Sequence, residues 1–234
     1  DATGASWADA YTSIQTGIDA AAAQKSAELP WVWVAEGVYV ERITMAGGVE
    51  VYGGFRAGDT SMADRDPDTR PTVIDGDNAG TVVSFAAITG AGLDGFTVRN
   101  GFSDMHGGGI ACRGTDASNF ISQCVVRENR AVSRGGGIYL GPGATIPVTD
   151  CAILGNVHVG MGDFGGGIMC DTGANATIAR CLIAANTGRF GGGLGCIMSS
   201  PTVEHCVISG NKAATWETNA DGRRHGSGGG GVFA

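Results

Sequence analysis

A short motif of three glycines followed by an aliphatic residue recurs along the second half of the chain. It occurs at Gly107–Ile110, Gly135–Ile138, Gly165–Ile168, Gly191–Leu194 and Gly229–Val232. The spacings between successive motifs are 28, 30, 26 and 38 residues. A period of about 27 residues with two short β-rich runs per repeat fits one turn of a solenoid better than a propeller blade or a leucine-rich unit. The repeat therefore predicts stacked β-coils.

A second motif alternates with the first, and it runs from a cysteine to an asparagine. Its copies are Cys124–Asn129, Cys151–Asn156, Cys181–Asn186 and Cys206–Asn211, and an earlier copy, Gly95–Asn100, lacks the cysteine. Stacked coils bring equivalent side chains into register. We therefore predict an aliphatic ladder of Ile110, Ile138, Ile168 and Leu194, and an asparagine ladder of Asn100, Asn129, Asn156, Asn186 and Asn211. The glycines then mark corners with positive φ, or places where a side chain would strike the next coil.

The fold class predicted is all-β, a right-handed parallel β-helix with an N-terminal capping α-helix. Ser6 and Asp9 have the spacing of a capping box, and apolar residues at helical spacing follow, so we predict a helix from Trp7 to Ala23. Strands are expected at 31–34 and 38–40. The helix would cover the open end of the stack, because uncovered strand edges promote aggregation. We expect a single domain over 1–234, with the cap and lead-in at 1–30, irregular first coils at 31–92 and regular coils at 93–234.

Composition and charge narrow the classes of partner. The chain has 42 glycines among 234 residues, yet 43% of its residues are hydrophobic, which is too many for a disordered glycine-rich linker. A net charge of -8 with only 15 Lys and Arg argues against binding nucleic acid or an anionic membrane. No apolar run is long enough to span a bilayer. The start at Asp1, with neither methionine nor basic leader, is expected of a mature or excised segment.

The repeats resemble those of a known family. Gly-Gly-Gly-Ile paired with an aliphatic-x-x-Asn motif is similar to the repeats of chlamydial polymorphic outer-membrane proteins, over residues 93–234. The front of the chain resembles secreted bacterial right-handed β-helix repeat proteins, through the segments 6–11, 35–39, 52–55, 65–66 and 74–77. The resemblance implies a pectin-lyase-like scaffold outside the bacterial cytoplasm, in proteins associated with adhesion or surface display. Val126 and its equivalents replace the phenylalanine of that family's motif, so adhesion rests on analogy.

Candidate chemical groups are few. Asp64, Asp66, Asp68 and Asp75 have a spacing that superficially matches a calcium loop, but Thr69 stands where such a loop needs glycine. The alternative is a solvated acidic loop held by arginines. His106, close to Asp104, could serve as a general base, and an exposed loop histidine is its other interpretation. We predict no catalytic residues and no cofactor other than this calcium.

The cysteines allow two interpretations. Disulfides within one coil would join Cys112 with Cys124, Cys170 with Cys181, and Cys196 with Cys206, and would leave Cys151 alone. Alternatively all are reduced and stack in the interior, where cysteine packs as a small hydrophobe. Sequence alone does not give the Cα separations that decide between them.

The function predicted is that of a non-enzymatic extracellular structural or adhesive protein that contacts carbohydrate, a cell surface or another copy of itself. The last residues, Gly231, Val232, Phe233 and Ala234, fall in the middle of a coil, so we predict an open end that could assemble end to end into filaments. The alternative is a β-helix that binds or cleaves polysaccharide. Cleavage would require carboxylates that converge on one face, and binding would require exposed aromatic residues in a row.

Overall fold

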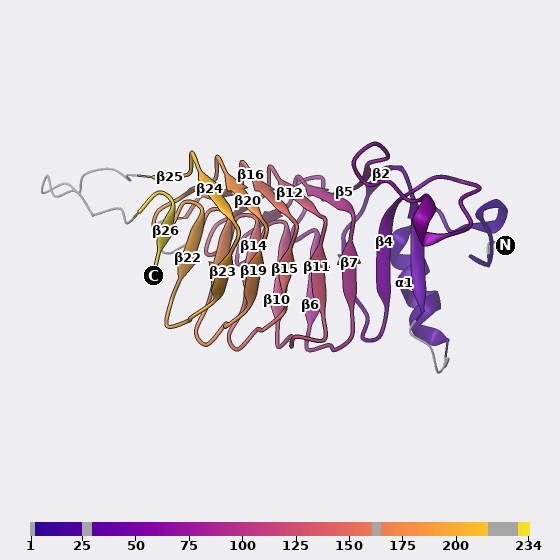
Figure 1. The fold of residues 1–234 in the computed structure, drawn as a ribbon, viewed down its shortest axis with the longest axis horizontal. Coiled ribbons are helices and arrows are strands. Elements are labelled where there is room, and N and C mark those ends of the chain that lie inside the picture. Colours follow the sequence, from indigo (N-terminus) through magenta and orange to yellow (C-terminus); the bar gives the residue numbers. More distant parts are fainter. Residues whose placement is uncertain (1–2, 25–29, 161–164, 215–228) are drawn as a thin grey trace, which may run out of the picture.

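A computed structural model describes residues 3–24, 30–160, 165–214 and 229–234. Short strands alternate with sharp corners, and each strand pairs in parallel with its equivalents one turn earlier and one turn later. The coils stack along the long axis, with the N- and C-terminal coils at opposite ends (Figure 1). The protein is a right-handed parallel β-helix with one N-terminal α-helix, as the sequence predicts.

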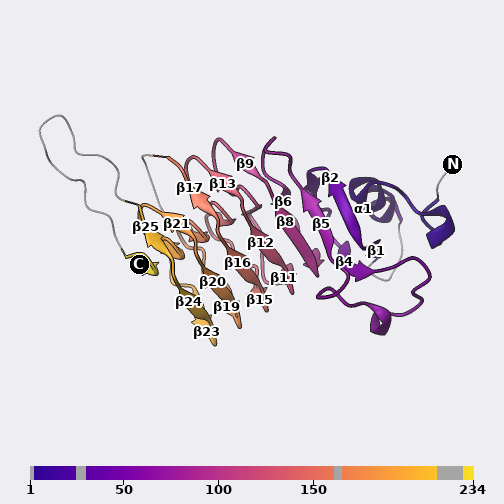
Figure 2. The same ribbon diagram turned by 90° about the horizontal axis from the view of Figure 1, so that it is seen from above.

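Three parallel sheets of seven strands run along the stack, a fourth of five strands begins at β9, and Figure 2 shows their strands side by side. The first sheet contains β1 (Trp31–Ala35), β4 (Glu50–Phe55), β7 (Gly92–Asp94), β11 (Phe120–Ser122), β15 (Val148–Thr149), β19 (Thr177–Ala179) and β23 (Thr202–Glu204). The second contains β2 (Gly37–Val40), β5 (Thr72–Asp75), β8 (Phe96–Arg99), β12 (Val125–Arg127), β16 (Ala152–Leu154), β20 (Leu182–Ala184) and β24 (Val207–Ser209). The third contains β3 (Ile43–Thr44), β6 (Val83–Ala86), β10 (Ile110–Arg113), β14 (Ile138–Leu140), β18 (Ile168–Cys170), β22 (Leu194–Cys196) and β26 (Val232–Phe233). The fourth contains β9 (Phe102–Ser103), β13 (Arg130–Ala131), β17 (Val157–His158), β21 (Thr187–Gly188) and β25 (Lys212–Ala213).

The aliphatic ladder forms in the predicted register on the third sheet. Ile110 pairs with Ile138, Ile138 with Ile168 and Ile168 with Leu194. All four side chains are almost completely buried. Because successive residues of a strand point to opposite faces, one residue in two fills the interior and the other faces outward.

The triple glycines serve both of the purposes that the sequence suggests. The first glycine of each of the first four motifs has positive φ, for example 63° at Gly135. The third lies against the next coil: a Cβ on Gly137 would stand 2.6 Å from the Gly167 carbonyl oxygen and 2.9 Å from Asn156 Nδ2. Only glycine allows the chain to pass this close to its neighbour.

Four asparagines form a ladder of side-chain amides, and the first three of them are completely buried. Nδ2 of Asn129, Asn156 and Asn186 each donates to Oδ1 of the asparagine one coil later, at 3.0 Å in all three cases. The same oxygens also accept backbone N–H groups, and the amide nitrogens also donate to backbone carbonyls such as that of Val126. The polar groups of the corner are thereby satisfied without water.

Asn100 does not belong to this ladder, so that part of the prediction is corrected. Gly101 takes the ladder position and donates its N–H to Asn129 Oδ1 at 2.8 Å. Asn100 stands one residue earlier, at a corner with φ of 54° that Glu128, Gly155, Ala185 and Gly210 share in later coils. Asparagine tolerates this left-handed conformation, and its amide instead donates to Asp75.

The N-terminal helix is shorter than the sequence predicts. Residues Trp7–Asp9 form a single 3-10 turn, η1, and Ser6 makes no capping hydrogen bond with its side chain. The α-helix, α1, runs from Ile14 to Ala23, and Ser13 is its N-cap. The Glu41 carboxylate accepts the Ile14 and Gln15 N–H groups, at 2.8 and 3.2 Å, and these bonds fix where the helix starts. Ile14, Ile18 and Ala21 are buried against the first coil, which α1 covers (Figure 1).

Candidate functional site

Aromatic side chains gather on the outer surface of the first sheet near its N-terminal end. Val34 points into the core, so Trp31 and Trp33, which alternate with it on β1, face outward. Tyr52 of β4 and Phe120 of β11 face the same way, one and three coils along from β1. Trp31 is 55% exposed, and the other three side chains are partly buried.

Three of these rings form a row along the axis of the stack, called here the aromatic row: Trp31, Tyr52 and Phe120. The ring centroids of Trp31 and Tyr52 are 6.0 Å apart, and those of Tyr52 and Phe120 are 6.5 Å apart. The row passes over Gly92, where a Cβ would stand 2.1 Å from the Phe120 ring. Glycine at this position therefore allows Phe120 to lie flat across β7 toward Tyr52.

Charged side chains hold the aromatic row in place. The Tyr52 hydroxyl donates to Glu50 Oε2 at 2.7 Å. Burial and the neighbouring Glu50 carboxylate raise the pKa of Tyr52, so this phenol remains a donor. The Arg65 guanidinium lies 5.4 Å from the centroid of the Tyr52 ring and pairs with Asp94. A ring fixed in this way loses little rotamer freedom when a ligand packs on it.

A second aromatic stack supports the row from the side of the 56–70 loop. The Trp33 and Phe55 rings stack with centroids 4.6 Å apart, and Trp7 lies 6.1 Å beyond Phe55. Trp7 Nε1 donates to the Asp59 carbonyl at 2.7 Å, and the Asp59 carboxylate pairs with Arg70 at 3.0 Å. These contacts tie the loop and the N-terminal segment to the aromatic surface.

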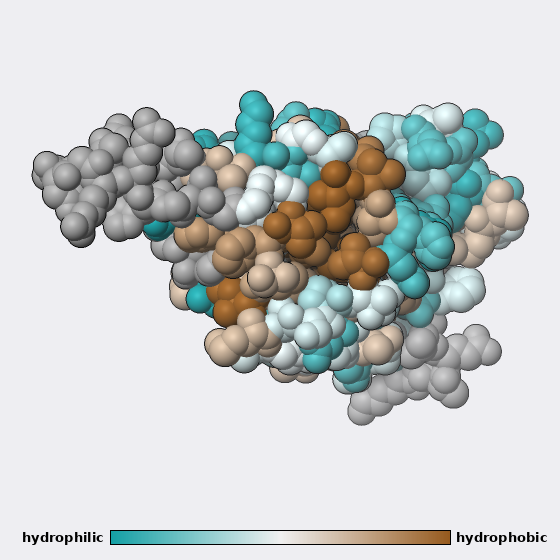
Figure 3. All heavy atoms as spheres, turned by 60° about the vertical axis from the view of Figure 1, so that its left-hand side comes forward, coloured by the Kyte–Doolittle hydropathy of each residue, from teal (hydrophilic) through white to brown (hydrophobic). Residues whose placement is uncertain are grey.

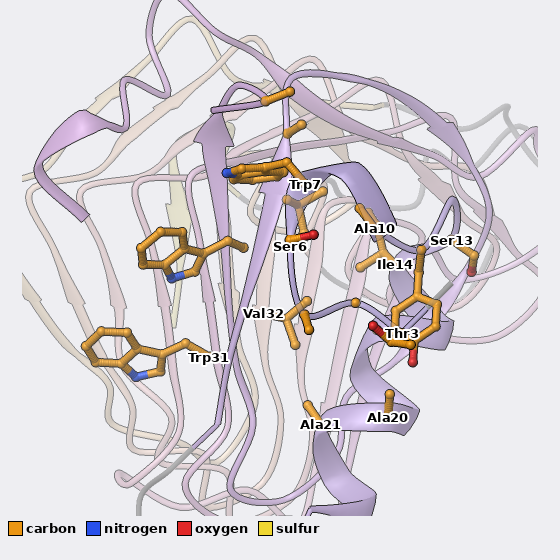
Figure 4. A pocket seen from close by; sticks show the side chains of 18 of the residues that line it. Thr3, Ser6, Trp7, Ala10, Ser13, Ile14, Ala20, Ala21, Trp31 and Val32 are labelled. Carbon is orange, nitrogen blue, oxygen red and sulfur yellow. The ribbon is translucent and has the colours of Figure 1, made fainter. Parts of the chain in front are cut away.

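A pocket of about 760 Å³ adjoins the aromatic row, between α1, the N-terminal segment and β1. In Figure 4, Val32 of β1 points toward Ile14 and Ala20 of α1, and the Trp31 side chain projects from the other side of β1. Trp7, Tyr11, Trp33 and Tyr39 also line it. Its size is that of typical ligand sites, which combine apolar walls with a few polar groups. Trp31 and Trp33 border both the pocket and the open sheet surface.

The predicted calcium residues do not converge. Asp64 accepts the N–H groups of Thr60 and Ser61 in a capping box, and Asp66 binds Thr69. Asp75 pairs with Arg99 at 2.8 Å, while Asp68 is exposed. Within residues 3–24, 30–160, 165–214 and 229–234 no three His, Cys, Asp or Glu side chains are grouped to hold a metal ion.

His106 lies away from the aromatic row, against the outer surface of the third sheet. Its ring stacks on Tyr139 with centroids 4.6 Å apart. The Tyr139 hydroxyl donates to Asp171 at 2.7 Å, and Asp171 also accepts from Arg134 at 2.5 Å. Burial and the charges of Arg113 and Arg134 lower the pKa of His106, which keeps the ring neutral. Tyr139 and Asp171 are almost completely buried, which indicates a structural network under the adjoining loops.

All seven cysteines are free thiols in the structure, and the contacts between them join neighbouring coils. Cys124, Cys151, Cys181 and Cys206 stack in one column, in which the Cys124 N–H lies 3.4 Å from Cys151 Sγ and the Cys181 N–H lies 3.4 Å from Cys206 Sγ. Cys170 pairs with Cys196 in another column, where Cys112 stacks between Phe85 and Leu140. The structure thus has the interior stacks of the second interpretation and contains no within-coil disulfide.

The predicted assembly end, Gly231–Ala234, takes part in the last coil. Val232 and Phe233 form β26, which pairs with β22, and the Gly231 carbonyl accepts the Leu194 N–H at 2.9 Å. The Phe233 ring lies 5.3 Å from that of Phe190.

The aromatic surface also carries acidic side chains. Its carboxylates already have partners: Asp59 pairs with Arg70, Asp94 with Arg65, and Glu50 with Tyr52. Binding to polysaccharide requires exposed aromatic residues in a row, and the sequence alone does not reveal this row, because its members come from three coils with no shared motif.

Fold and surface together define a solenoid with an aromatic patch on its side. The chain belongs to the right-handed β-helix family, whose model, described as a right handed beta helix region, matches residues 73–226. Comparison with curated proteins gives no match. In the part that the structure describes, no helix is long and apolar enough to cross a membrane.

Two solved structures are similar to this chain at low sequence identity. One is a candidate glycosyl hydrolase from Parabacteroides merdae ATCC 43184, with 12% identity, a TM-score of 0.48, and coverage of 83% of this chain and 88% of that one. The other is a pectin methylesterase mutant in complex with a hexasaccharide, with 12% identity, a TM-score of 0.42, and coverage of 93% of this chain and 70% of that one.

Proposed function

We propose that the protein is an extracellular, non-enzymatic adhesive scaffold that binds neutral polysaccharide through the aromatic row. The observation that carries this proposal is the alignment of Trp31, Tyr52 and Phe120 along the stack, with centroids 6.0 and 6.5 Å apart. The C–H face of a sugar ring packs against aromatic rings, and a chain of sugars can follow a row of them. The pocket beside Trp31 would receive a chain end or a side branch.

Charge supports a neutral polymer over an acidic one. Glu50 lies within the row, and the chain as a whole carries a net charge of -8. A polyuronate would be repelled by this field, and the two arginines nearest the row, Arg65 and Arg70, are already paired with Asp94 and Asp59.

Replacement of Trp31 by alanine is expected to weaken binding to neutral polysaccharide about tenfold, which corresponds to about 1.4 kcal/mol. Affinity electrophoresis against neutral and acidic polysaccharides measures this effect. Phe102→Ala is the matched control, because Phe102 is a half-buried aromatic residue on the fourth sheet, outside the row. Equal affinities for the two variants, or preferential binding to a polyuronate, would contradict the proposal. Release of shorter sugars during the assay would favour the polysaccharide-cleaving alternative.

We also propose that two copies of the chain associate through their C-terminal coils. Val203, Ile208 and Val232 occupy interior positions that are buried in earlier coils, yet Val203 is 40% and Val232 47% exposed. Hydrophobic residues gather on this side of the molecule (Figure 3). The opposite end is covered by α1, so a head-to-tail filament would require α1 to move. Two like ends can meet without that change.

The 234-residue chain is expected to be dimeric in light scattering after size exclusion, and Val203→Asp is expected to make it monomeric. A charge at this position would be buried in the contact without a partner. If the chain without the substitution were monomeric, association through the C-terminal coils would be excluded. Regular fibres in electron micrographs would support the head-to-tail filament instead.

A further inference from the structure

Cys170 and Cys196 occupy directly paired positions in neighbouring coils. They are the last residues of β18 and β22, and the strand register places them opposite each other. Paired strands lie about 4.8 Å apart, which is inside the range of Cα separations of about 4.4 to 6.8 Å that disulfides span. The cysteines that the sequence pairs with them lie elsewhere, because Cys181 and Cys206 precede strands of the second sheet.

The two thiols also differ in a way that favours reaction between them. The Cys170 thiol hydrogen-bonds to the Cys196 sulfur, and this contact lowers the pKa of Cys196. The thiolate is the reactive form of cysteine. Cys196 is 6% exposed whereas Cys170 is completely buried, so a reagent reaches Cys196 first.

Cys112 provides an internal comparison in the same column. Its neighbours one coil away are Phe85 and Leu140, so no thiol faces it across the strand register. Burial raises its pKa well above the usual value. Its environment is therefore that of a purely structural cysteine.

We propose that Cys170 and Cys196 are a modification site, at which a low-molecular-weight disulfide converts the two thiols into a disulfide between neighbouring coils. The Cys196 thiolate attacks one sulfur of the reagent, forming a mixed disulfide and releasing one reagent thiol. The Cys170 sulfur, on losing its proton, then attacks Cys196 Sγ and releases the second reagent thiol. The protein loses two hydrogen atoms, and the reagent is reduced to two thiols.

Incubation of the whole protein with oxidised glutathione, followed by alkylation and peptide mapping, tests this site. Arg180 lies between Cys170 and Cys181, and Glu204 lies between Cys196 and Cys206. Digestion with trypsin and a Glu-specific protease therefore separates the two cysteines of each within-coil pair, and fragment ions distinguish Cys170 from Cys151, which stays on the same peptide. We expect tandem mass spectrometry to find the Cys170–Cys196 linkage, and dithiothreitol to remove it. Cys112→Ser should retain the linkage and Cys196→Ser should lose it.

The linkage found by mapping distinguishes pairing between coils from pairing within a coil. A linkage of Cys170 to Cys181, or of Cys196 to Cys206, would support the within-coil pairing and overturn the proposal. Complete alkylation of both Cys170 and Cys196 after the incubation would also overturn it. Peptide mapping of the protein without substitutions gives this answer even if a serine variant fails to fold.

Discussion

Replacement of Asn156 by alanine is expected to lower the free energy of unfolding by about 3 to 5 kcal/mol, because several buried polar groups would lose their partners at once. Asn156 Oδ1 accepts the backbone N–H and the Nδ2 group of Asn129, at 3.1 and 3.0 Å. Its own Nδ2 donates to the Val126 carbonyl at 2.8 Å. None of these groups is near water, since the corner is completely buried.

Guanidinium unfolding followed by circular dichroism measures this loss, and Asn211→Ala is the matched control. Asn211 stands at the end of the ladder and is only partly buried, so its replacement is expected to cost about 1 kcal/mol. If both variants lost the same stability, the ladder would not be the main source of order at this corner.

Replacement of Gly137 by alanine is expected to cost about 3 kcal/mol, because the new methyl group would meet atoms that cannot move. Its Cβ would stand 2.6 Å from the Gly167 carbonyl oxygen, which is held by the Ile138 N–H at 2.8 Å. Asn156 Nδ2, at 2.9 Å, is held by the ladder.

The control for this variant is Gly155→Ala, measured in the same unfolding experiment. Gly155 has φ of 61°, and no atom lies within 4 Å of a Cβ placed there. Ala185 already adopts φ of 57° at the equivalent corner of the next coil, so the cost should be about 1 kcal/mol. A loss at Gly137 no greater than that at Gly155 would show that close approach does not make the third glycine necessary.

The repeated parts of the fold could be predicted from the sequence. The prediction was wrong where one contact sets the position of a residue or the start of a helix. The asparagines from Asn129 to Asn211 share a motif and a register, whereas Asn100 stands one residue out of register because Gly101 takes the ladder position. The helix starts at Ile14, not at Trp7, because a carboxylate distant in sequence, that of Glu41, accepts its first N–H groups.

The aromatic row shows why the candidate site could not be predicted in the same way. Trp31, Tyr52 and Phe120 lie in coils of unequal length, and only the strand register shows that Phe120 stands over Gly92. The cysteines show the same dependence on register, since motif spacing suggested pairs within a coil while the contacts join different coils.

The asparagine ladder gives the stack an electrical direction. Each amide points its oxygen toward the preceding coil and an N–H toward the following one, so the amide dipoles add from Asn129 to Asn211. Dipoles of the strands themselves largely cancel. At the N-terminal end of the ladder, the Gly101 N–H donates to Asn129 Oδ1, in the same direction as the bonds between the asparagines. A group that extends it beyond Asn211 must offer an acceptor oxygen, so the polarity of the column would discriminate between the neighbours that could follow it.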